Sequence, residues 1–438
     1  MDVIIIYERK LRELENAILL KINLEKKGLK CDVRQFYEVN RLLKASKSRP
    51  KVIASPHLYI TKSIPRIFSR FGEANFIINL QYEQVLSEKW EKLGHHNPKD
   101  EAKKAFHICW GGKTRDRLVE SGVAKDNIIV LGALHLDLLR KEFREKYFAA
   151  KNVFAEKYNI SSDKKWTLFI SSFTYADITD ERLKMNESAA NTSLSSFVSI
   201  HTDSRDKILK WFEGVLKKDL KNIIIYRPHP DELALEKVIE LEKKYENFVI
   251  IKNESVKNWI SSCDKIYSWY STSVVEAHFL EKAYSILRPY ELPSDFDSVL
   301  LKNASFIKSY DEFEEDYFNS ENNTKFPIDD SFVNQYYSFN HLNPSFDLYT
   351  DFIKNLCNSE EKQEFSINRI MRLKAKLTTL SVWIVYSLYK MSNIDLNKYR
   401  SQRKNNYLIN WFIEMDNQIA TDKEKNEIEN RLRKVLNR

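Results

Sequence analysis

Short apolar runs alternate with helical patterns along most of the chain, and this alternation constrains the fold more than any other feature. Val3–Tyr7 fits a buried strand, and residues 11–27 after it have the spacing of an amphipathic helix that ends at Gly28. The same order predicts further strands at residues 31–33, 51–54, 75–80, 106–110, 127–131, 166–170, 223–226, 248–251 and 265–269. Such alternation predicts parallel, doubly wound α/β sheets.

The length of the chain predicts more than one domain. At 438 residues it exceeds a typical single domain. We expect residues 1–150 and 151–345 to form two α/β domains, and residues 346–438 to form a helical C-terminal segment. Within the second domain, the polar segment 176–204 is expected to be a long loop near the ligand site.

Cysteine spacing and hydropathy exclude several classes of protein. The four cysteines lack CxxC spacing, which argues against a zinc site or a disulfide framework. The N-terminus has no positive region before its first apolar run, so it reads as a strand and not as a signal peptide. No stretch reaches the roughly 18 apolar residues of a membrane span. We therefore expect a cytoplasmic protein.

One expected strand runs into a stiff loop whose side chains suit a phosphate. Residues 223–226 are followed directly by Arg227-Pro228-His229-Pro230. The prolines fix φ and remove two backbone donors. Arg can bind a phosphate through two parallel hydrogen bonds, and His can donate to a phosphate oxygen or to a leaving group. The alternative is a structural turn that carries a surface Arg and a hydrogen-bonded His.

A second strand end carries hydroxyl groups. The expected strand 265–269 is followed by Ser271-Thr272-Ser273 and then by Glu276. Ser273 and Glu276 have the spacing of a capping box, so one interpretation is a simple helix cap. A helix start with three hydroxyls also suits an anion, and Glu276 would reach a ribose hydroxyl. Because parallel strands end at one edge of a sheet, the two loops are expected to line one ligand site.

These residues resemble the C-terminal domains of GT-B bacterial glycosyltransferases of the surface-carbohydrate biosynthesis group, akin to Kdo transferases and CDP-glycerol glycerophosphotransferases. Tyr7–Leu14 resembles the first strand-to-helix turn of that group. Trp110-Gly111, Ile128–Gly132 and Asp137 resemble its "W-G … V-x-G-x-x-x-x-D" stretch. Residues 132–135 depart from the group, which often has Asn-Pro-Arg there. The resemblance covers roughly residues 1–300.

The resemblance implies a fold and a division of labour. The fold is α/β, of the GT-B kind, with two Rossmann-like doubly wound domains facing a cleft and a C-terminal helical segment. Residues 1–150 would take the acceptor, and residues 151–345 would bind the nucleotide-sugar donor. The implied donor-binding residues are Arg227, His229, Ser271, Thr272, Ser273 and Glu276.

An inverting GT-B enzyme also needs a base for the acceptor hydroxyl. Glu8 and Glu83 each follow an expected strand of the N-terminal domain, and either is a candidate. For Glu8 the alternative is a solvated carboxylate at a helix start, which is a favourable place for one. His57, which also ends a strand, and Arg9 are expected on the acceptor side. His229 is the candidate for the catalytic group on the leaving phosphate.

No metal or cofactor is expected. Asp295-Phe296-Asp297 has the letters of a DxD motif but follows Pro293 in a loop, and His95-His96 lacks the other ligands of a metal site. The resemblance implies a metal-independent reaction, because GT-B enzymes stabilise the leaving phosphate with Arg, His and helix dipoles.

The positive charge is concentrated in one segment. Residues 363–404 hold nine Lys or Arg and two acidic residues, nearly the whole excess of +8 in the chain. The rest is close to neutral, which argues against a nucleic-acid partner. Basic residues beside an apolar run predict an interfacial helix within residues 367–404 on an anionic inner leaflet. The alternative is a helix packed on the N-terminal domain with Trp383 and Tyr386 in the core.

The leading hypothesis is a glycosyltransferase that moves a sugar from a nucleotide to a growing bacterial surface glycan, such as a capsule, a lipopolysaccharide or an O-antigen. A CMP-activated ulosonic acid is one candidate donor, and the acceptor is expected to be lipid-linked at the inner face of the cytoplasmic membrane. Two alternatives stay open. One is a sugar-nucleotide 2-epimerase of the same fold, and the other is a non-catalytic glycan-binding or scaffold protein.

Overall fold

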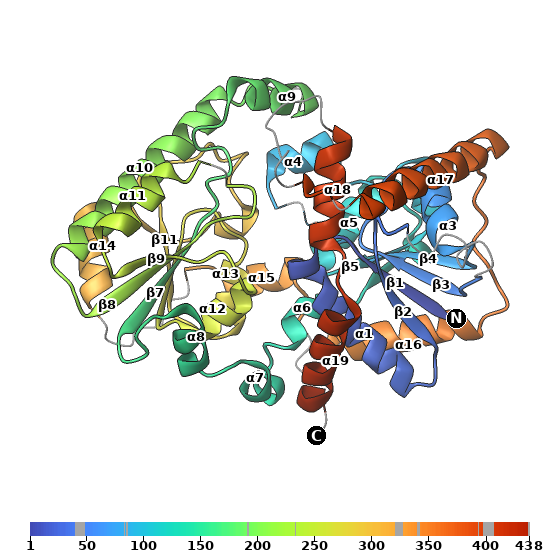
Figure 1. Cartoon of the computed structure of the whole chain (residues 1–438), viewed down its shortest axis with the longest axis horizontal. Coiled ribbons are helices and arrows are strands. Elements are labelled where there is room, and N and C mark those ends of the chain that lie inside the picture. The colour runs from blue at the N-terminus through green and yellow to red at the C-terminus, as the bar shows by residue number, and fades with distance from the viewer. Residues whose placement is uncertain are drawn as a thin grey trace. The chain divides into compact units, whose positions relative to one another are not determined.

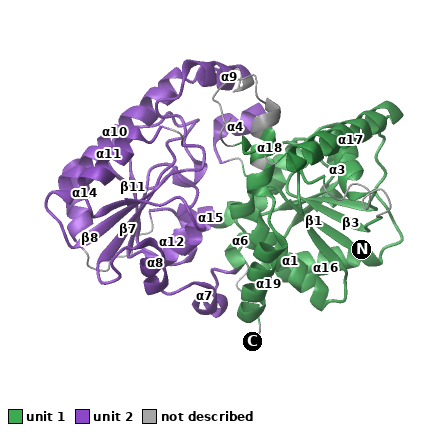
Figure 2. Ribbon diagram, viewed as in Figure 1, with its two compact units in different colours: residues 1–84, 95–137, 334–438 green, residues 85–94, 138–333 purple. Residues whose placement is uncertain are grey.

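The chain forms two compact units, which are coloured separately in Figure 2. The structure is a computed structural model that describes residues 1–39, 49–82, 84, 86–190, 192–232, 234–319, 327–339, 342–392, 394–396 and 407–436. Unit 1 comprises residues 1–84, 95–137 and 334–438, and unit 2 comprises residues 85–94 and 138–333. The C-terminal segment is therefore part of unit 1.

Unit 1 is built on a parallel six-stranded sheet (Figure 1). Its strands, in spatial order, are β2 (Cys31–Gln35), β1 (Val3–Tyr7), β3 (Val52–Ser55), β4 (Phe76–Asn79), β5 (Phe106–Cys109) and β6 (Ile128–Val130). All five residues of β1 are buried. A strand that is apolar at every position requires cover on both faces of the sheet, as doubly wound folds provide.

Helices supply that cover. Ile4 and Ile6 of β1 pack with Ile64 and Ile67 of α3, and the alternate residues of β1 point to the opposite face. Among its described residues before 138, the helices are a π-helical turn at Lys10–Leu14, α1 (Glu15–Lys26), α3 (Ser63–Phe71), α5 (Gly112–Glu120) and α6 (Leu134–Asp137), with short 3-10 turns at Asp100–Lys104 and Lys125–Asn127.

The C-terminal helices pack on unit 1. They are α16 (Ser345–Asn358), α17 (Arg369–Met391), α18 (Tyr407–Gln418) and α19 (Asp422–Leu436), preceded by α15 (Asp330–Tyr336). On the α1 side, Lys21 pairs with Glu429 at 2.8 Å, and the backbone N–H of Ala420 donates to the Tyr7 hydroxyl at 2.8 Å. Tyr386 is 3% exposed and packs in a cluster with Phe412. The alternative interpretation of this segment, a helix packed on the N-terminal domain, is therefore confirmed for Tyr386.

The stretch from Trp110-Gly111 to Gly132 and Asp137 contacts the part of the chain that returns to unit 1 from residue 334. A Cβ on Gly111 would lie 2.3 Å from the carbonyl oxygen of Gln335, and Gly132 has φ +83°. The Asp137 carboxylate accepts the backbone N–H groups of Ser345 at 2.9 Å and Phe346 at 2.7 Å. These bonds satisfy free N–H groups at the start of α16. In this chain the stretch therefore has a structural role.

Unit 2 contains a second parallel six-stranded sheet. In spatial order its strands are β12 (Phe306–Ile307), β11 (Tyr284–Leu287), β10 (Lys265–Ser268), β7 (Lys165–Ile170), β8 (Asn222–Arg227) and β9 (Phe248–Ile250). Its helices are α4 (Glu88–Leu93), α7 (Lys141–Tyr147), α8 (Lys151–Tyr158), α9 (Asp180–Ala190), α10 (Ser195–Leu216), α11 (Glu236–Lys244), α12 (Val256–Ser262), α13 (Val274–Phe279) and α14 (Tyr310–Phe318), with a 3-10 turn at Val299–Leu301.

The expected loop over residues 176–204 is wrong, because α9 and the first part of α10 occupy most of it. The polar composition of this segment hides a helical repeat. Leu194, Phe197, His201, Ser204 and Ile208 recur every three or four residues, and each is at most 2% exposed. This face of the segment packs in the core of the unit.

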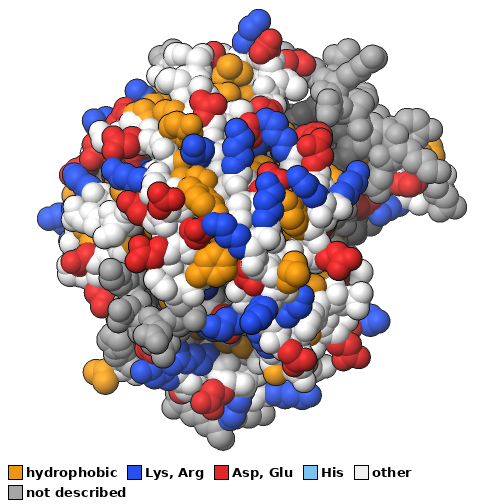
Figure 3. All heavy atoms as spheres, turned by 90° about the vertical axis from the view of Figure 1, so that its left-hand side faces the viewer, with side chains coloured by type: hydrophobic (Ala, Val, Ile, Leu, Met, Phe, Trp, Pro, Cys, Tyr) orange, Lys and Arg blue, Asp and Glu red, His pale blue; other side chains and the backbone are white. Residues whose placement is uncertain are grey.

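The nine strands expected after the first are all present, each within about two residues of its expected bounds. Two short strands, β11 and β12, were not expected. The outer face of unit 2 shown in Figure 3 mixes Lys and Arg with Asp and Glu. That face therefore carries no extended field of one sign.

Candidate functional site

In unit 1 the chain changes direction across the sheet between β1 and β3. From β1 it moves to β2 on one side, and it then returns to β3 on the other side. Ligands of open α/β sheets bind outside the carboxyl ends of the strands at such a switch point. Glu8 directly follows β1, and His57 lies two residues beyond β3.

The main chain at Glu8 is fixed on two sides. Its N–H donates to the Glu13 carboxylate at 2.6 Å, and its carbonyl oxygen accepts the Gln35 side-chain amide at 3.1 Å. Glu13 itself is fully buried and is held by Arg12 at 2.5 Å. Arg9 is exposed, and its backbone N–H also donates to Glu13, at 3.3 Å. The turn therefore presents Glu8 from a rigid backbone.

The structure brings Glu8 and His57 together. His57 Nδ1 lies 3.5 Å from Glu8 Oε2, with side-chain exposures of 19% and 13%. The Tyr37 hydroxyl donates to Glu8 Oε1 at 3.1 Å, and burial raises the pKa of Tyr37, so it stays a donor. The His57 ring lies between Phe36 and Tyr59. Nδ1 has no hydrogen-bond partner among the described residues, so its contact with Glu8 is an ion pair that forms when the ring is protonated.

Glu83, the other candidate base, lies outside the described residues. Sequence reasoning named Glu8 and His57 separately, and it gave them different roles. Their pairing depends on β1 and β3 being neighbours in the sheet, with Ile5 beside Ala54. The apolar runs alone do not specify strand order, so the sequence carried no signal for this contact.

In unit 2 the corresponding switch point lies between β7 and β10. The register places Ile170 at the end of β7 beside Arg227 of β8 and beside Ser268 of β10. Neighbouring strands are about 4.8 Å apart, so the loops after β8 and β10 leave the same edge about 10 Å from each other. The sheet thus brings the two expected donor-binding loops to one edge.

Arg227 forms hydrogen bonds within unit 2. Its guanidinium donates to the carbonyl oxygens of Glu254 at 2.7 Å and Lys252 at 3.3 Å. Burial lowers the pKa of this guanidinium. These bonds tie the end of β8 to the loop after β9. A direct contact from Arg227 to a phosphate stays a prediction.

Glu232 organises the loop that carries His229. Its carboxylate accepts the Ser171 hydroxyl at 2.6 Å, the Tyr226 hydroxyl at 2.7 Å and the backbone N–H of His229 at 3.2 Å. It is 4% exposed, and burial raises its pKa. Sequence reasoning gave Glu232 no role, although an acid two residues after a rigid proline was a visible signal.

His229 is the accessible member of this loop, with 43% of its side chain exposed. Its Nδ1 accepts the backbone N–H of Asp231 at 3.1 Å. A neutral imidazole that accepts at Nδ1 carries its proton on Nε2. In the neutral ring this bond favours the tautomer that carries its proton on Nε2.

The expected capping box at Ser273 and Glu276 is wrong. Ser273 makes no side-chain cap at the start of α13, which has only six residues. Ser271 Oγ accepts the N–H of Ser273 at 3.2 Å, and Ser268 Oγ accepts the N–H of Ser271 at 3.2 Å. These bonds form a chain of serine turns, which takes the place of a cap. The true capping box is at Ser309 and Glu312.

The hydroxyl loop and Glu276 differ in exposure. Thr272 is exposed, while Ser271, Ser273 and Glu276 are partly buried. Burial raises the pKa of the Glu276 carboxyl to about 7, although Lys257 and the backbone N–H of Glu276 act in the opposite direction. The Glu276 side chain therefore changes charge near neutral pH, unlike an ordinary carboxylate.

Several buried polar atoms near the same edge have no hydrogen-bond partner within the described part of the chain. They are Ser172 Oγ, Trp269 Nε1 and both ring nitrogens of His201. His201 lies against Trp269, with ring centroids 4.6 Å apart. Burial lowers the pKa of His201 to about 3, so its ring is neutral. Each such atom costs about 1–3 kcal/mol unless water or a ligand reaches it.

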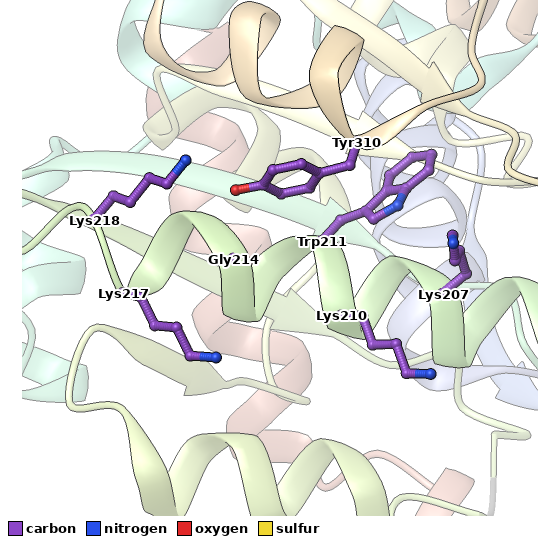
Figure 4. A pocket seen from close by; sticks show the side chains of 7 residues that line it. All are labelled: Lys207, Lys210, Trp211, Gly214, Lys217, Lys218 and Tyr310. Carbon is purple, nitrogen blue, oxygen red and sulfur yellow. The ribbon is translucent and has the colours of Figure 1, made fainter.

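A separate groove of about 450 Å³ lies between α10 and Tyr310 at the start of α14 (Figure 4). It is lined by Lys207, Lys210, Trp211, Gly214, Lys217, Lys218 and Tyr310. Two of its cations are already paired, Lys218 with Glu314 at 2.5 Å and Lys217 with Glu213 at 3.5 Å. None of the expected site residues lines this groove.

Neither a metal cluster nor a membrane span is found in the part of the chain that the structure describes. No group of three or more His, Cys, Asp and Glu side chains there is arranged to hold a metal ion. No helix there is long and apolar enough to cross a bilayer.

Comparison with known proteins identifies the fold. No family model and no curated protein matches the chain. Among solved structures, a UDP-GlcNAc 2-epimerase from Neisseria meningitidis bound to UDP-GlcNAc is 11% identical, with a TM-score of 0.51 over 81% of this chain and 100% of that one. The wall teichoic acid polymerase TagF with CDPG is 9% identical, with a TM-score of 0.47 over 81% and 88%. With its two parallel sheets and this likeness to the epimerase, the chain has the two-domain α/β GT-B fold.

Proposed function

We propose that the protein is a glycosyltransferase that uses a nucleotide-sugar donor. The observation that carries this proposal is the pair of Glu8 and His57 at the switch point of unit 1, with 3.5 Å between Oε2 and Nδ1. A carboxylate within ion-pair distance of a histidine would stabilise the imidazolium that general-base catalysis forms.

In the proposed reaction, His57 Nε2 takes the proton of an acceptor hydroxyl as its oxygen attacks the anomeric carbon of the donor sugar. The bond from that carbon to the phosphate oxygen breaks, and the nucleotide leaves with both electrons. Glu8 stabilises the imidazolium that forms, as the carboxylate of a catalytic triad does. Tyr37 holds Glu8 in place through its 3.1 Å hydrogen bond.

Unit 2 would bind the donor. His229 would donate from Nε2 to the leaving phosphate, and the hydroxyls of Ser271, Thr272 and Ser273 would add neutral donors. Glu276, when ionised, would accept from a ribose hydroxyl. Arg227 would act on the phosphate indirectly, because its hydrogen bonds to the loop after β9 hold the end of β8 in place. This assignment requires no metal ion.

The finer identity of the substrates is also part of the proposal. We propose a bacterial surface glycan as the product, a lipid-linked glycan at the inner leaflet as the acceptor, and a CMP-activated ulosonic acid as one candidate donor. The resemblance of the loop sequences to capsule and lipopolysaccharide enzymes supports this choice.

A sugar-nucleotide 2-epimerase is the second candidate. The likeness to the Neisseria meningitidis epimerase favours it. The two reactions leave different products. A transferase releases the nucleotide, whereas an epimerase returns the altered sugar on the same nucleotide.

The test begins with thermal shift against CMP, CDP, UDP and GDP, because a bound ligand raises the melting temperature. Sugar conjugates of the responding nucleotide are then incubated with lipid-linked glycan extracts, and the products are separated by chromatography and mass spectrometry. Free nucleotide plus an extended glycan, lost in His57→Ala and kept in the exposed His95→Ala control, supports the transferase. Epimerised donor with no free nucleotide supports the epimerase. Absence of any nucleotide binding contradicts both and favours a scaffold protein.

A further inference from the structure

α17 has two apolar faces, and unit 1 covers only one of them. The inner face carries Ala375, Thr379 and Tyr386, which are 6%, 2% and 3% exposed. Ser69 of α3 hydrogen-bonds Thr379 across this contact at 2.7 Å. α17 lies along α3 in Figure 1. Packing on the core of unit 1 therefore accounts for the inner face.

The outer face is a continuous apolar stripe. Leu373, Leu377, Ile384 and Leu388 are 57%, 54%, 45% and 61% exposed. At 3.6 residues per turn these positions lie within about 30° of a line opposite Ala375 and Tyr386. The whole stripe comprises Ile370, Leu373, Leu377, Leu380, Ile384, Leu388 and Met391. Scattered exposed apolar residues are ordinary, but a stripe along six turns of one helix marks an interaction surface.

The charges on α17 are all of one sign. Its 23 residues contain five cations and no acidic residue. The cations are Arg369, Arg372, Lys374, Lys376 and Lys390. Arg372 pairs with Glu73 and Lys390 with Asp416. The other three form no ion pair with any residue that the structure describes, and two of them, Lys374 and Lys376, lie on opposite sides of the stripe.

We propose that the outer face of α17 binds the surface of an anionic lipid bilayer, with the helix in the membrane plane. An apolar stripe bordered by cations is the pattern of interfacial helices, whose Lys and Arg side chains reach lipid headgroups. A second copy of this chain is a poorer occupant. A symmetric contact through this stripe would bring two such helices together, each with three cations that pair with no described residue and with no acid of its own.

This inference rests on α17 alone and is independent of the proposed reaction. The test of lipid binding and the test of the proposed reaction can therefore fail or succeed separately. Unit 2 supplies a control pair. Leu220 and Val153 are 76% and 51% exposed.

The test is flotation of the full chain with vesicles of phosphatidylcholine alone or with 30% phosphatidylglycerol, at low and at 0.5 M salt. We expect wild type to float with the anionic vesicles and high salt to weaken this binding. Leu377→Ser with Ile384→Ser should lower binding more than tenfold. Lys374→Gln with Lys376→Gln should lower it about 25-fold, since each cation near an anionic surface contributes about fivefold. Leu220→Ser with Val153→Ser should bind as wild type.

Circular dichroism and melting temperature establish that each variant is folded, which the exposure of the changed residues leads us to expect. The inference is overturned if wild type does not float with anionic vesicles, or if the stripe variant floats equally well. It is also overturned if wild type is a dimer by light scattering, the stripe variant is a monomer, and neither binds vesicles. That outcome would assign the stripe to a second copy.

Discussion

Glu232 gives the sharpest test of how the donor-side edge of unit 2 is built. Glu232→Ala removes a buried acceptor that serves the Ser171 hydroxyl, the Tyr226 hydroxyl and the N–H of His229. A hydrogen bond to a charged group contributes about 1.5–3 kcal/mol. The change therefore removes three bonds from the end of β7 and the loop after β8.

The net loss is smaller than the sum of three bonds. Without Glu232 the single proton of the Tyr226 hydroxyl can turn to Ser171 Oγ, which lies 2.9 Å away, so one hydroxyl finds a new partner. Burial also raises the pKa of Glu232, so part of the cost of a buried charge disappears with the side chain. We expect a loss of about 3 kcal/mol in the free energy of unfolding of unit 2. Glu232→Gln keeps one acceptor oxygen and should cost about 1 kcal/mol.

The sign of the pH dependence follows from the raised pKa. The folded state holds the Glu232 proton more tightly than the unfolded chain does, so this group stabilises the fold at low pH. That contribution falls as the pH rises from the ordinary carboxyl pKa through the raised one. Glu232→Gln carries no titrating group and should lack this slope.

The assay is hydrogen exchange with mass spectrometry on peptides covering residues 165–171 and 222–232, combined with urea unfolding. Exchange localises the effect to unit 2, because two units need not unfold in one step. Glu240→Ala changes an exposed carboxylate on neighbouring α11 and should leave both measurements unchanged. If Glu232→Ala shifts the unfolding free energy by less than about 0.5 kcal/mol and exchange is unaltered, the three-bond reasoning is refuted.

Three further predictions concern the proposed reaction. His57→Ala should lower kcat by about 100-fold or more with unchanged nucleotide affinity. Glu8→Gln should also lower kcat, while Tyr37 still donates to the new amide. Equal kcat in wild type and both variants would contradict the assignment of His57 as the base. Nucleotide affinity, measured by calorimetry, should rise as the pH increases through about 7, because Glu276 ionises there, and Glu276→Gln should abolish this dependence. Activity should survive EDTA, and its loss with recovery on adding a divalent ion would contradict metal independence.

The strands were predictable because their physical signal is local. β1 is apolar at every position and β8 at its four central positions, and such runs read as buried strands in parallel sheets. β12 has only two residues and gives no such signal. The first part of α10 was missed for a different reason. Its buried face includes His201 and Ser204, which composition assigns to loops although their spacing is helical.

The candidate site was predictable in part. Parallel strands must end at one edge, so Arg227 and Ser271 could be assigned to the same edge of the sheet from the sequence. The Glu8 and His57 contact needs the spatial order of the strands, which is a property of the whole sheet. The serine turns at Ser271 and Ser273 show the limit of motif spacing, because a capping box also requires extended backbone at the cap. Ser273 has φ −67° and ψ −5°, so its side chain does not cap the helix.

The C-terminal segment shows how two sequence interpretations can both have a basis in one helix. Its apolar content was consistent with packing on unit 1 and with an interfacial role, and composition alone could not separate these two interpretations. The position of each residue around the helix axis does separate them. Residues 375, 379 and 386 share one side of α17 and are buried, while residues 373, 377, 384 and 388 lie half a turn away and are exposed. Packing therefore explains one face only. The opposite face is bordered by cations that form no ion pair with a described residue, and it still needs a partner of its own.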